Sequence, residues 1–85
     1  MFYVYILKSK KDDQLYLGYT NNLRKRLKEH NLGLVSSTKL RTPLYLVYYE
    51  AYAIRQDATK REHNLKLRAK ALRQLRNRIG GSLEA

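Results

Sequence analysis

Residues 16–30 constrain the fold of this chain most, because strand formers, turn formers and helix formers follow one another within them. The aromatic start of this segment, Tyr16–Tyr19, is typical of an extended strand. Gly18 has no Cβ, so another group can approach the strand closely there. The polar residues 20–22 then offer side-chain oxygens to the free amides of a helix that begins at Leu23. The segment therefore predicts a strand, a turn and a helix N-terminus, and the last of these favours an anion.

Two basic side chains share one face of the predicted helix. Arg26 and His30 are four residues apart, which places them side by side on a helix surface. An aromatic strand would therefore lead into an arginine–histidine face beside a place where a phosphate could sit. Each residue also has a structural interpretation: Arg26 as a solvated charge, and His30 as a helix-end cation that complements the helix dipole.

The charge of the chain narrows the classes of partner. Its 85 residues include 18 lysines and arginines against 7 acids, which gives a net charge of +11. A domain this small and basic is typical of proteins that bind a polyanion, with nucleic acid as the first candidate and an anionic membrane as the second. No apolar run approaches membrane-spanning length, the N-terminus does not resemble a signal peptide, and the chain has no cysteine. We therefore expect a soluble cytoplasmic protein that binds nucleic acid and no membrane.

The pattern of apolar residues predicts one small domain. Apolar and aromatic runs favour strands at residues 2–8, 15–19 and 44–50, and helical spacing favours helices at 23–30, 51–66 and, with a basic face, 72–79. The order β-β-α-β-α-α indicates an α/β (α+β) fold over residues 1–79, with a small three-stranded sheet flanked by helices. The short first link favours an antiparallel hairpin, and the helix before the third strand favours a mixed sheet. Residues 80–85 are expected to form a flexible tail.

One carboxylate lies where a helix should be apolar. Glu62 recurs with Ala58 and Leu65 at helical spacing, on the face predicted to pack inward. A charged side chain is out of place there on burial grounds. Its structural interpretation is an ion pair with Arg61 or with Lys66, which follows four residues later. Glu62 is therefore either a functional carboxylate or half of an ion pair on a helix.

Short motifs follow one another in order along nearly the whole chain. They are Tyr3-Val4-Tyr5, Tyr16-Leu17-Gly18, a Thr-Asn-x-Leu-x-x-Arg-Leu-x-x-His-Asn run from Thr20 to Asn31, the strand Pro43–Glu50, and Ala58-x-x-Arg61-Glu62. In this order and spacing they resemble the GIY-YIG nuclease domain, specifically its small stand-alone bacterial members. The sequence departs from the family in having Tyr3 where a glycine is usual. Neither Asn64 nor Asn77 can be matched to a late asparagine that some larger members carry.

The resemblance implies a metal-dependent endonuclease that hydrolyses DNA phosphodiester bonds. Arg26 matches the arginine of the family, which would hold phosphate oxygens through paired donors. Glu62 matches its metal-binding glutamate, which would hold Mg²⁺ or Mn²⁺ together with water. Tyr5 or Tyr16 would orient or deprotonate the attacking water, or His30 would take that role. The sequence leaves the choice among these three residues open.

A wider set of residues is expected to contact the nucleic acid. These are Gly18, Tyr19, Thr20, Asn21, Arg24, Ser37, Thr38, Lys39, Arg41, Lys66 and Arg68. The DNA could be single-stranded, duplex or branched, and a targeting protein partner could select it. Two other functions fit the same residues: a non-catalytic basic module that binds nucleic acid, and a scaffold whose tyrosine-rich face binds a protein. Taken singly, Tyr5 and Tyr16 also have a structural interpretation, as core aromatics with satisfied hydroxyls.

Overall fold

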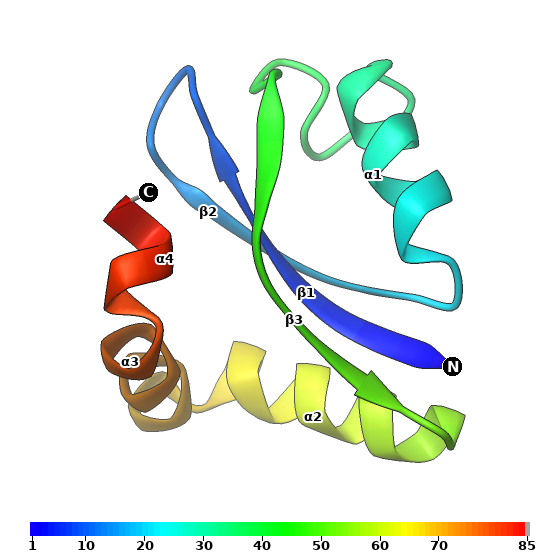
Figure 1. Cartoon of the computed structure of the whole chain (residues 1–85), viewed down its shortest axis with the longest axis vertical. Coiled ribbons are helices and arrows are strands. Elements are labelled where there is room, and N and C mark those ends of the chain that lie inside the picture. Colours follow the sequence, from blue (N-terminus) through cyan, green and yellow to red (C-terminus); the bar gives the residue numbers. More distant parts are fainter. Residues whose placement is uncertain (85) are drawn as a thin grey trace.

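The secondary-structure elements follow the order expected from the sequence, with different boundaries and one additional helix. The computed structural model describes residues 1–84, and of residue 69 the backbone alone. Its elements, labelled in Figure 1, are β1 (Phe2–Ser9), β2 (Leu15–Thr20), α1 (Leu23–Asn31), β3 (Leu44–Tyr52), α2 (Arg55–Leu67), α3 (Ala69–Arg78) and α4 (Gly80–Glu84). The predicted α+β class, with a three-stranded sheet flanked by helices, is confirmed.

The sheet is antiparallel throughout, with β1 between β2 and β3. The predicted β1–β2 hairpin is confirmed, whereas the expectation of a mixed sheet is wrong. β2 and β3 run in the same direction, but the connection through α1 crosses β1 and places β3 on its other side. Because β1 separates the two like-directed strands, every pairing in the sheet is antiparallel. β2 is therefore an edge strand, and one of its sides is open to other elements.

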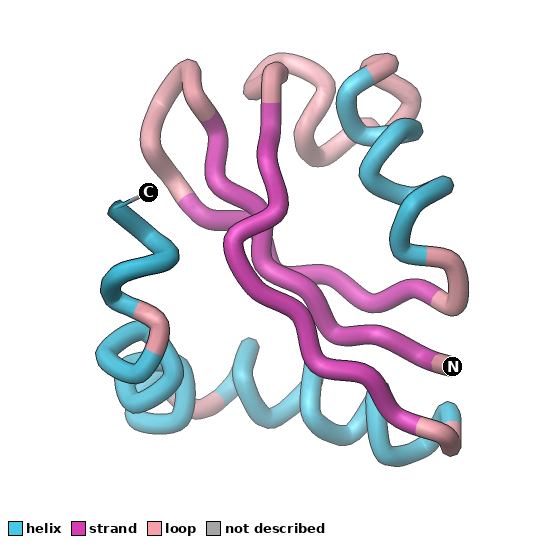
Figure 2. Tube along the Cα trace, in the orientation of Figure 1, coloured by secondary structure: helices cyan, strands magenta, loops and turns pink. Residues whose placement is uncertain are grey.

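Alternate residues of β1 point to opposite faces of the sheet, and helices cover both faces. Val4 and Ile6 pack against Ala58 and Leu65 of α2 and against residues of α3 and α4. Tyr5 belongs to a second cluster, which includes residues of α1. Figures 1 and 2 show α1 on one side of the sheet and α2, α3 and α4 on the other. The inward direction predicted for the apolar residues of α2 is confirmed.

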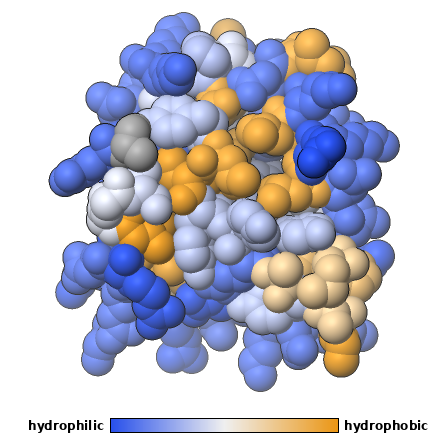
Figure 3. Space-filling model, viewed as in Figure 1, coloured by the Kyte–Doolittle hydropathy of each residue, from blue (hydrophilic) through white to orange (hydrophobic). Residues whose placement is uncertain are grey.

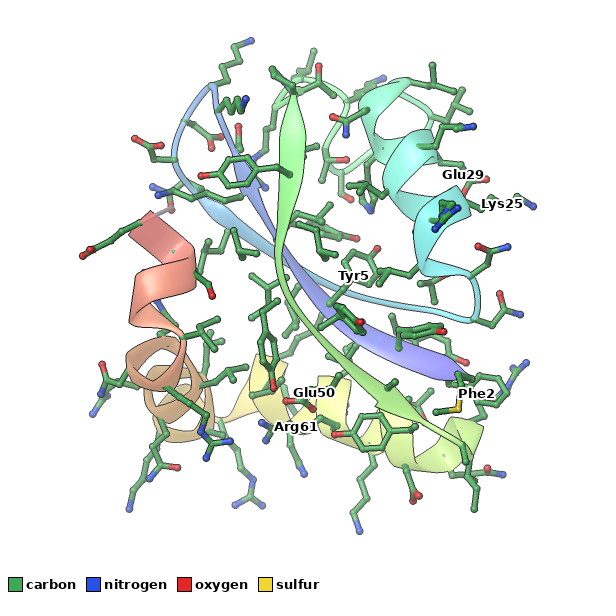
Figure 4. All side chains as sticks on the ribbon, in the orientation of Figure 1. Phe2, Tyr5, Lys25, Glu29, Glu50 and Arg61 are labelled. Atoms are coloured by element: carbon green, nitrogen blue, oxygen red, sulfur yellow. The ribbon has the colours of Figure 1, made fainter. Side chains whose placement is uncertain are left out.

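Helix α2 begins later than predicted because β3 continues the sheet further. β3 pairs with β1 until Tyr52 stands opposite Phe2, so residues predicted as helix are strand. Near the end of β3, the Glu50 carboxylate accepts hydrogen bonds from Arg61 at 2.9 and 3.0 Å, and from the hydroxyls of Tyr48 and Tyr52. Figure 4 shows Glu50 beside Arg61 over α2. This part-buried network holds α2 against β3 and so sets the direction of the α2 side chains.

Residues 80–84, expected to be a flexible tail, form a short helix. Leu83 of α4 packs against the core, and its carbonyl accepts a hydrogen bond from Nζ of Lys8 at 2.8 Å. A lysine of β1 therefore holds α4 to the sheet. The last position of the predicted tail, residue 85, lies outside the described residues. None of the described helices combines the length and apolar character needed to cross a bilayer.

Candidate active site

Tyr5 lies at the centre of the candidate site, and a glycine makes room for its ring. Tyr5 of β1 stands directly opposite Gly18 of β2. A Cβ on Gly18 would overlap the ring carbons and the hydroxyl of Tyr5. Only glycine therefore allows the tyrosine ring to lie against β2 at this point. Figure 4 shows Tyr5 in the space between the sheet and α1.

A chain of buried hydrogen bonds runs from Tyr5 to the loop after α1. The Tyr5 hydroxyl lies 2.9 Å from Nε2 of His30, and Nδ1 of the same ring lies 2.7 Å from the hydroxyl of Thr38. All three residues are at most 1% exposed. Either imidazole tautomer satisfies both hydrogen bonds, because each hydroxyl can donate or accept. His30 is therefore a buried link between β1 and the loop, and not a solvated cation at the helix end.

The second signature tyrosine completes the aromatic surroundings of His30. The Tyr16 ring meets the His30 ring edge-on at a centroid distance of 5.0 Å, and its centroid is 6.3 Å from that of Tyr5. Edge contacts of this kind are favourable and restrict the orientation of both rings. Tyr16 therefore holds the imidazole in place, while Tyr5 supplies the hydroxyl that contacts it.

Burial and neighbouring charges set the protonation of Tyr5 and His30. Burial raises the pKa of Tyr5 to about 12; the Arg26 guanidinium beside its hydroxyl opposes this increase, and Tyr16 and Glu62 add to it. Burial also lowers the pKa of His30 below its usual value, and the charge of Arg26 lowers it further. At neutral pH the pair is therefore a neutral phenol and a neutral imidazole.

Arg26 lies on the wall of a groove at the start of α1. Its guanidinium pairs with Glu29 at 3.4 Å, and its side chain is 37% exposed. The groove has a volume of about 340 Å³ and is referred to as the basic groove; its lining is Tyr19, Thr20, Asn21, Asn22, Lys25, Arg26, Glu29 and Arg55. Figure 4 shows Lys25 and Glu29 on α1, away from the sheet. Three cations and one carboxylate leave this groove with a positive charge that suits a phosphate.

Glu62 approaches the same region from the other side of the sheet. α1 and α2 cover different faces, but the basic groove passes around the edge strand β2, from Arg26 of α1 to Arg55 of α2. Glu62 follows Arg55 by about two helical turns and so lies on the same side of α2. The charge of its carboxylate is the smallest of the effects that raise the pKa of Tyr5. Arg26 and Arg55 therefore line one groove, and Glu62 lies about two helical turns along α2 from Arg55, outside the lining of that groove.

Comparison with known proteins identifies the family of this chain. The family model described as the GIY-YIG catalytic domain matches residues 1–77. The chain belongs to the GIY-YIG family. It is 49% identical over 67 residues to a UPF0213 protein of Clostridium perfringens, and this alignment covers 78% of this chain and 71% of that protein. It is 45% identical over 65 residues to a UPF0213 protein of Staphylococcus haemolyticus, covering 75% and 78%.

A solved structure shows the same arrangement of elements. The solution NMR structure of a UPF0213 protein from Bacillus halodurans superposes with a TM-score of 0.57 at 33% identity, over 94% of this chain and 88% of that one. In this GIY-YIG domain, the two signature segments that include Tyr5 and Gly18 are neighbouring strands of one hairpin. The resemblance found in the sequence is therefore confirmed for both the family and the fold.

Glu62 is the carboxylate that the sequence predicts as a metal ligand. Glu62 pairs with Lys66 at 3.2 Å, and its side chain is 21% exposed. Among the described residues, no three His, Cys, Asp or Glu side chains form a cluster that could hold a metal ion. One partly open carboxylate fits Mg²⁺ or Mn²⁺, because these ions accept water and phosphate oxygens as their other ligands. It does not fit a structural zinc ion, which needs four protein ligands.

The residues predicted to contact nucleic acid have different environments. Six are exposed and two are partly exposed: Asn21, Arg24, Ser37, Lys39, Lys66 and Arg68, then Tyr19 and Thr20. Gly18 and Thr38 are buried, so their expected contact with nucleic acid is replaced by contacts with Tyr5 and His30. Arg41 is partly buried and pairs with Asp12 at 2.9 Å, which holds it against the β1–β2 turn.

Four residues that line the basic groove were missed as site residues from the sequence. They are Asn22, Lys25, Glu29 and Arg55. The Asn22 side chain accepts a hydrogen bond from the amide of Lys25 at 3.1 Å, so it serves as the helix cap that the sequence predicts. The spacing of Arg55 from Glu62 was a usable signal, since residues seven apart lie on one side of a helix.

Proposed function

We propose that this GIY-YIG protein is a metal-dependent endonuclease that hydrolyses phosphodiester bonds in DNA. The strongest support is the contact of three chemical groups beside β2, with a carboxylate on the neighbouring helix. The Tyr5 hydroxyl contacts His30 and lies beside Arg26. Glu62 lies about two helical turns along α2 from Arg55 of the basic groove. Phosphodiester hydrolysis needs a cation for the phosphate oxygens, a route for the proton of water and a ligand for a metal. The three contacting groups and Glu62 supply those parts.

Arg26 holds the scissile phosphate in this proposal. Its present partner, Glu29, lies 3.4 Å away in a part-exposed pair, which contributes little to stability. Phosphate oxygens can replace that carboxylate and form shorter, charge-assisted hydrogen bonds with the guanidinium. Lys25 and Arg55 line the same groove and would attract the neighbouring phosphates of the strand.

Tyr5 and His30 transfer the proton of the attacking water. A phenol with a pKa of about 12 does not act as a base alone at neutral pH, but neutral His30 lies 2.9 Å away. With Nδ1–H donating to Thr38, Nε2 can accept the Tyr5 proton while Tyr5 takes a proton from water. The water oxygen bonds to phosphorus, the bond to the leaving oxygen breaks, and that oxygen takes a proton from solvent. Tyr16 keeps the imidazole oriented for this transfer.

Glu62 would hold Mg²⁺ or Mn²⁺ together with water and phosphate oxygens. Bound there, such an ion would supply positive charge that favours polarisation of a phosphate and stabilises a leaving oxygen. Lys66, which pairs with the carboxylate in this structure, would then be available to the DNA backbone. Selection of a particular DNA by a targeting protein partner remains a prediction.

A cleavage assay tests the proposal. Labelled single-stranded, duplex and branched DNA is incubated with wild type, Glu62→Ala or Asp57→Ala, in Mg²⁺, Mn²⁺ or EDTA. Asp57 is an exposed acid on the same helix and serves as the matched control. We expect cleavage by wild type and Asp57→Ala with metal, and none by Glu62→Ala or in EDTA. Cleavage by Glu62→Ala at the wild-type rate would contradict the assigned role of this carboxylate.

The ion pair between Glu62 and Lys66 favours one alternative. If that pair is the whole role of Glu62, the protein is a non-catalytic basic module that binds nucleic acid. Binding would then fall steeply with salt and would be indifferent to Glu62→Ala, and no DNA substrate would be cut. The same set of variants therefore distinguishes the two functions.

A further inference from the structure

A second groove opens on the α1 side of the sheet. It has a volume of about 440 Å³ and lies between α1 and β3. Its apolar lining includes Leu23 and Leu27 of α1 and Leu46 of β3, and its aromatic lining is Tyr3 and Tyr49. Figure 3 shows apolar side chains in the space between β3 and α1, with hydrophilic side chains along the outer side of α1. This second site is referred to as the tyrosine groove.

The tyrosine groove presents an aromatic ring to solvent. Tyr49 is 52% exposed, although it lies within a strand of the sheet. Its ring is held by Tyr3, whose centroid is 6.0 Å away at an angle of 64°. A ring that is positioned by a neighbour and still half exposed can stack on another planar ring without being reorganised.

The tyrosine groove and the basic groove share a boundary. Asn21 and Asn22, in the turn between β2 and α1, line both of them. A strand whose phosphate is held by Arg26 would therefore have an adjoining nucleoside beside the tyrosine groove. Arg24, which is exposed, also lines this groove and provides a cation for the next phosphate.

We propose that the tyrosine groove binds one unpaired nucleobase next to the scissile phosphate, stacked on Tyr49. This inference rests on the proposed nuclease function, and it names the form of DNA that the site takes. A base inside a duplex is already stacked on both faces, so only an unpaired base can offer a face to Tyr49. The charge of +11 and the arginine beside the groove favour a polynucleotide over an apolar protein segment as the occupant.

A binding assay in EDTA tests the inference without cleavage. Fluorescence anisotropy is measured with a short labelled oligothymidine, an abasic strand of the same length and a duplex of the same length. We expect Tyr49→Ala to bind the oligothymidine about 5- to 100-fold more weakly than wild type, and Tyr49→Phe to bind it normally. For the abasic strand, and likewise for the duplex, wild type and Tyr49→Ala should have the same affinity. The salt dependence should be unchanged, since no phosphate contact is removed.

Tyr45 provides the matched control on the same strand. It lies toward the other end of β3, with Nζ of Lys10 at 5.7 Å from its ring, and does not line the tyrosine groove. Tyr45→Ala should bind all three probes like wild type. The inference is overturned if Tyr49→Ala binds oligothymidine like wild type, or loses the same affinity for the abasic strand. These outcomes do not depend on Glu62. A protein that stacks bases but cuts no DNA would therefore refute the proposed nuclease activity and leave the base-stacking inference intact.

Discussion

Tyr5 and Gly18 stand opposite each other in the β1–β2 pair, and the Tyr5 ring fills the space that a side chain at position 18 would need. Because the ring lies there, its hydroxyl reaches His30 at 2.9 Å. Gly18 of one signature segment therefore leaves the space that the ring of Tyr5, in the other segment, occupies.

Replacing Gly18 by alanine should displace Tyr5 and destabilise the fold. The new Cβ would overlap the Tyr5 ring, and overpacking of this kind costs about 1–3 kcal/mol. Urea unfolding of Gly18→Ala measures the loss. Gly81→Ala is the control, because nothing lies within 4 Å of a Cβ built there. Equal stability of the two variants would mean that Tyr5 does not depend on the glycine.

Replacing Thr38 by valine should destabilise the fold through His30. The change keeps the shape of the side chain but leaves Nδ1 of a buried imidazole without its partner, a loss of about 1–3 kcal/mol. Chemical unfolding should show this loss for Thr38→Val and a smaller one for Thr38→Ser, which keeps the hydroxyl. Ser37→Ala, at an exposed neighbouring position, should be close to wild type. A valine variant as stable as the serine variant would refute the link.

Lowering the pH from about 7 to 5 should reduce stability through His30. Its folded pKa is below the usual 6.5, chiefly because of burial. Between the two pKa values the unfolded state binds more protons, so the free energy of unfolding falls as the pH falls. Urea unfolding across this range should show a steeper decrease for wild type than for His30→Gln. Identical slopes would show that His30 titrates alike in both states.

Replacing Glu50 by alanine should loosen α2 from β3. The change leaves the part-buried Arg61 guanidinium and the hydroxyls of Tyr48 and Tyr52 without their shared acceptor, at a cost of about 2–3 kcal/mol. A double-mutant cycle with Arg61→Ala measures the coupling by chemical unfolding. We expect the double variant to lose less than the sum of the single losses. Simple additivity would mean that the ion pair contributes nothing of its own.

The contribution of Glu50 to the free energy of unfolding should also depend on pH. Burial raises the pKa of this carboxyl, but hydrogen bonds from Arg61, Tyr48 and Tyr52 outweigh burial and hold it below its usual value. A lowered folded pKa means that this stability is present above the unfolded pKa and is lost as the pH falls through the folded one. Glu50→Ala should therefore lose less stability than wild type on acidification below about pH 4.

Much of the site follows from neighbours along the chain. The β1–β2 hairpin, the capped start of α1 and the shared face of Arg26 and His30 depend on turn length, capping chemistry and helical spacing. The burial of Ala58 and Leu65 follows from the same spacing and is confirmed. These features could be predicted because each is specified within a few residues.

Other features depend on which surfaces pack together. Nothing near His30 in sequence indicates that Thr38 completes its hydrogen bonds, because that contact needs the loop to fold back under α1. The extension of β3 through Tyr52 depends on pairing with Phe2, which is distant in the chain. Helical spacing identified the side of α2 that carries Glu62, but not the face of the sheet that α2 would cover.

Local residue patterns therefore specify the elements, the caps and the residue types of the site. The order β2-β1-β3 and the placement of α1 and α2 on opposite faces are properties of the packed molecule. They arise because burial of apolar surface is non-directional: it favours compact arrangements, and long-range strand pairing then selects one of them.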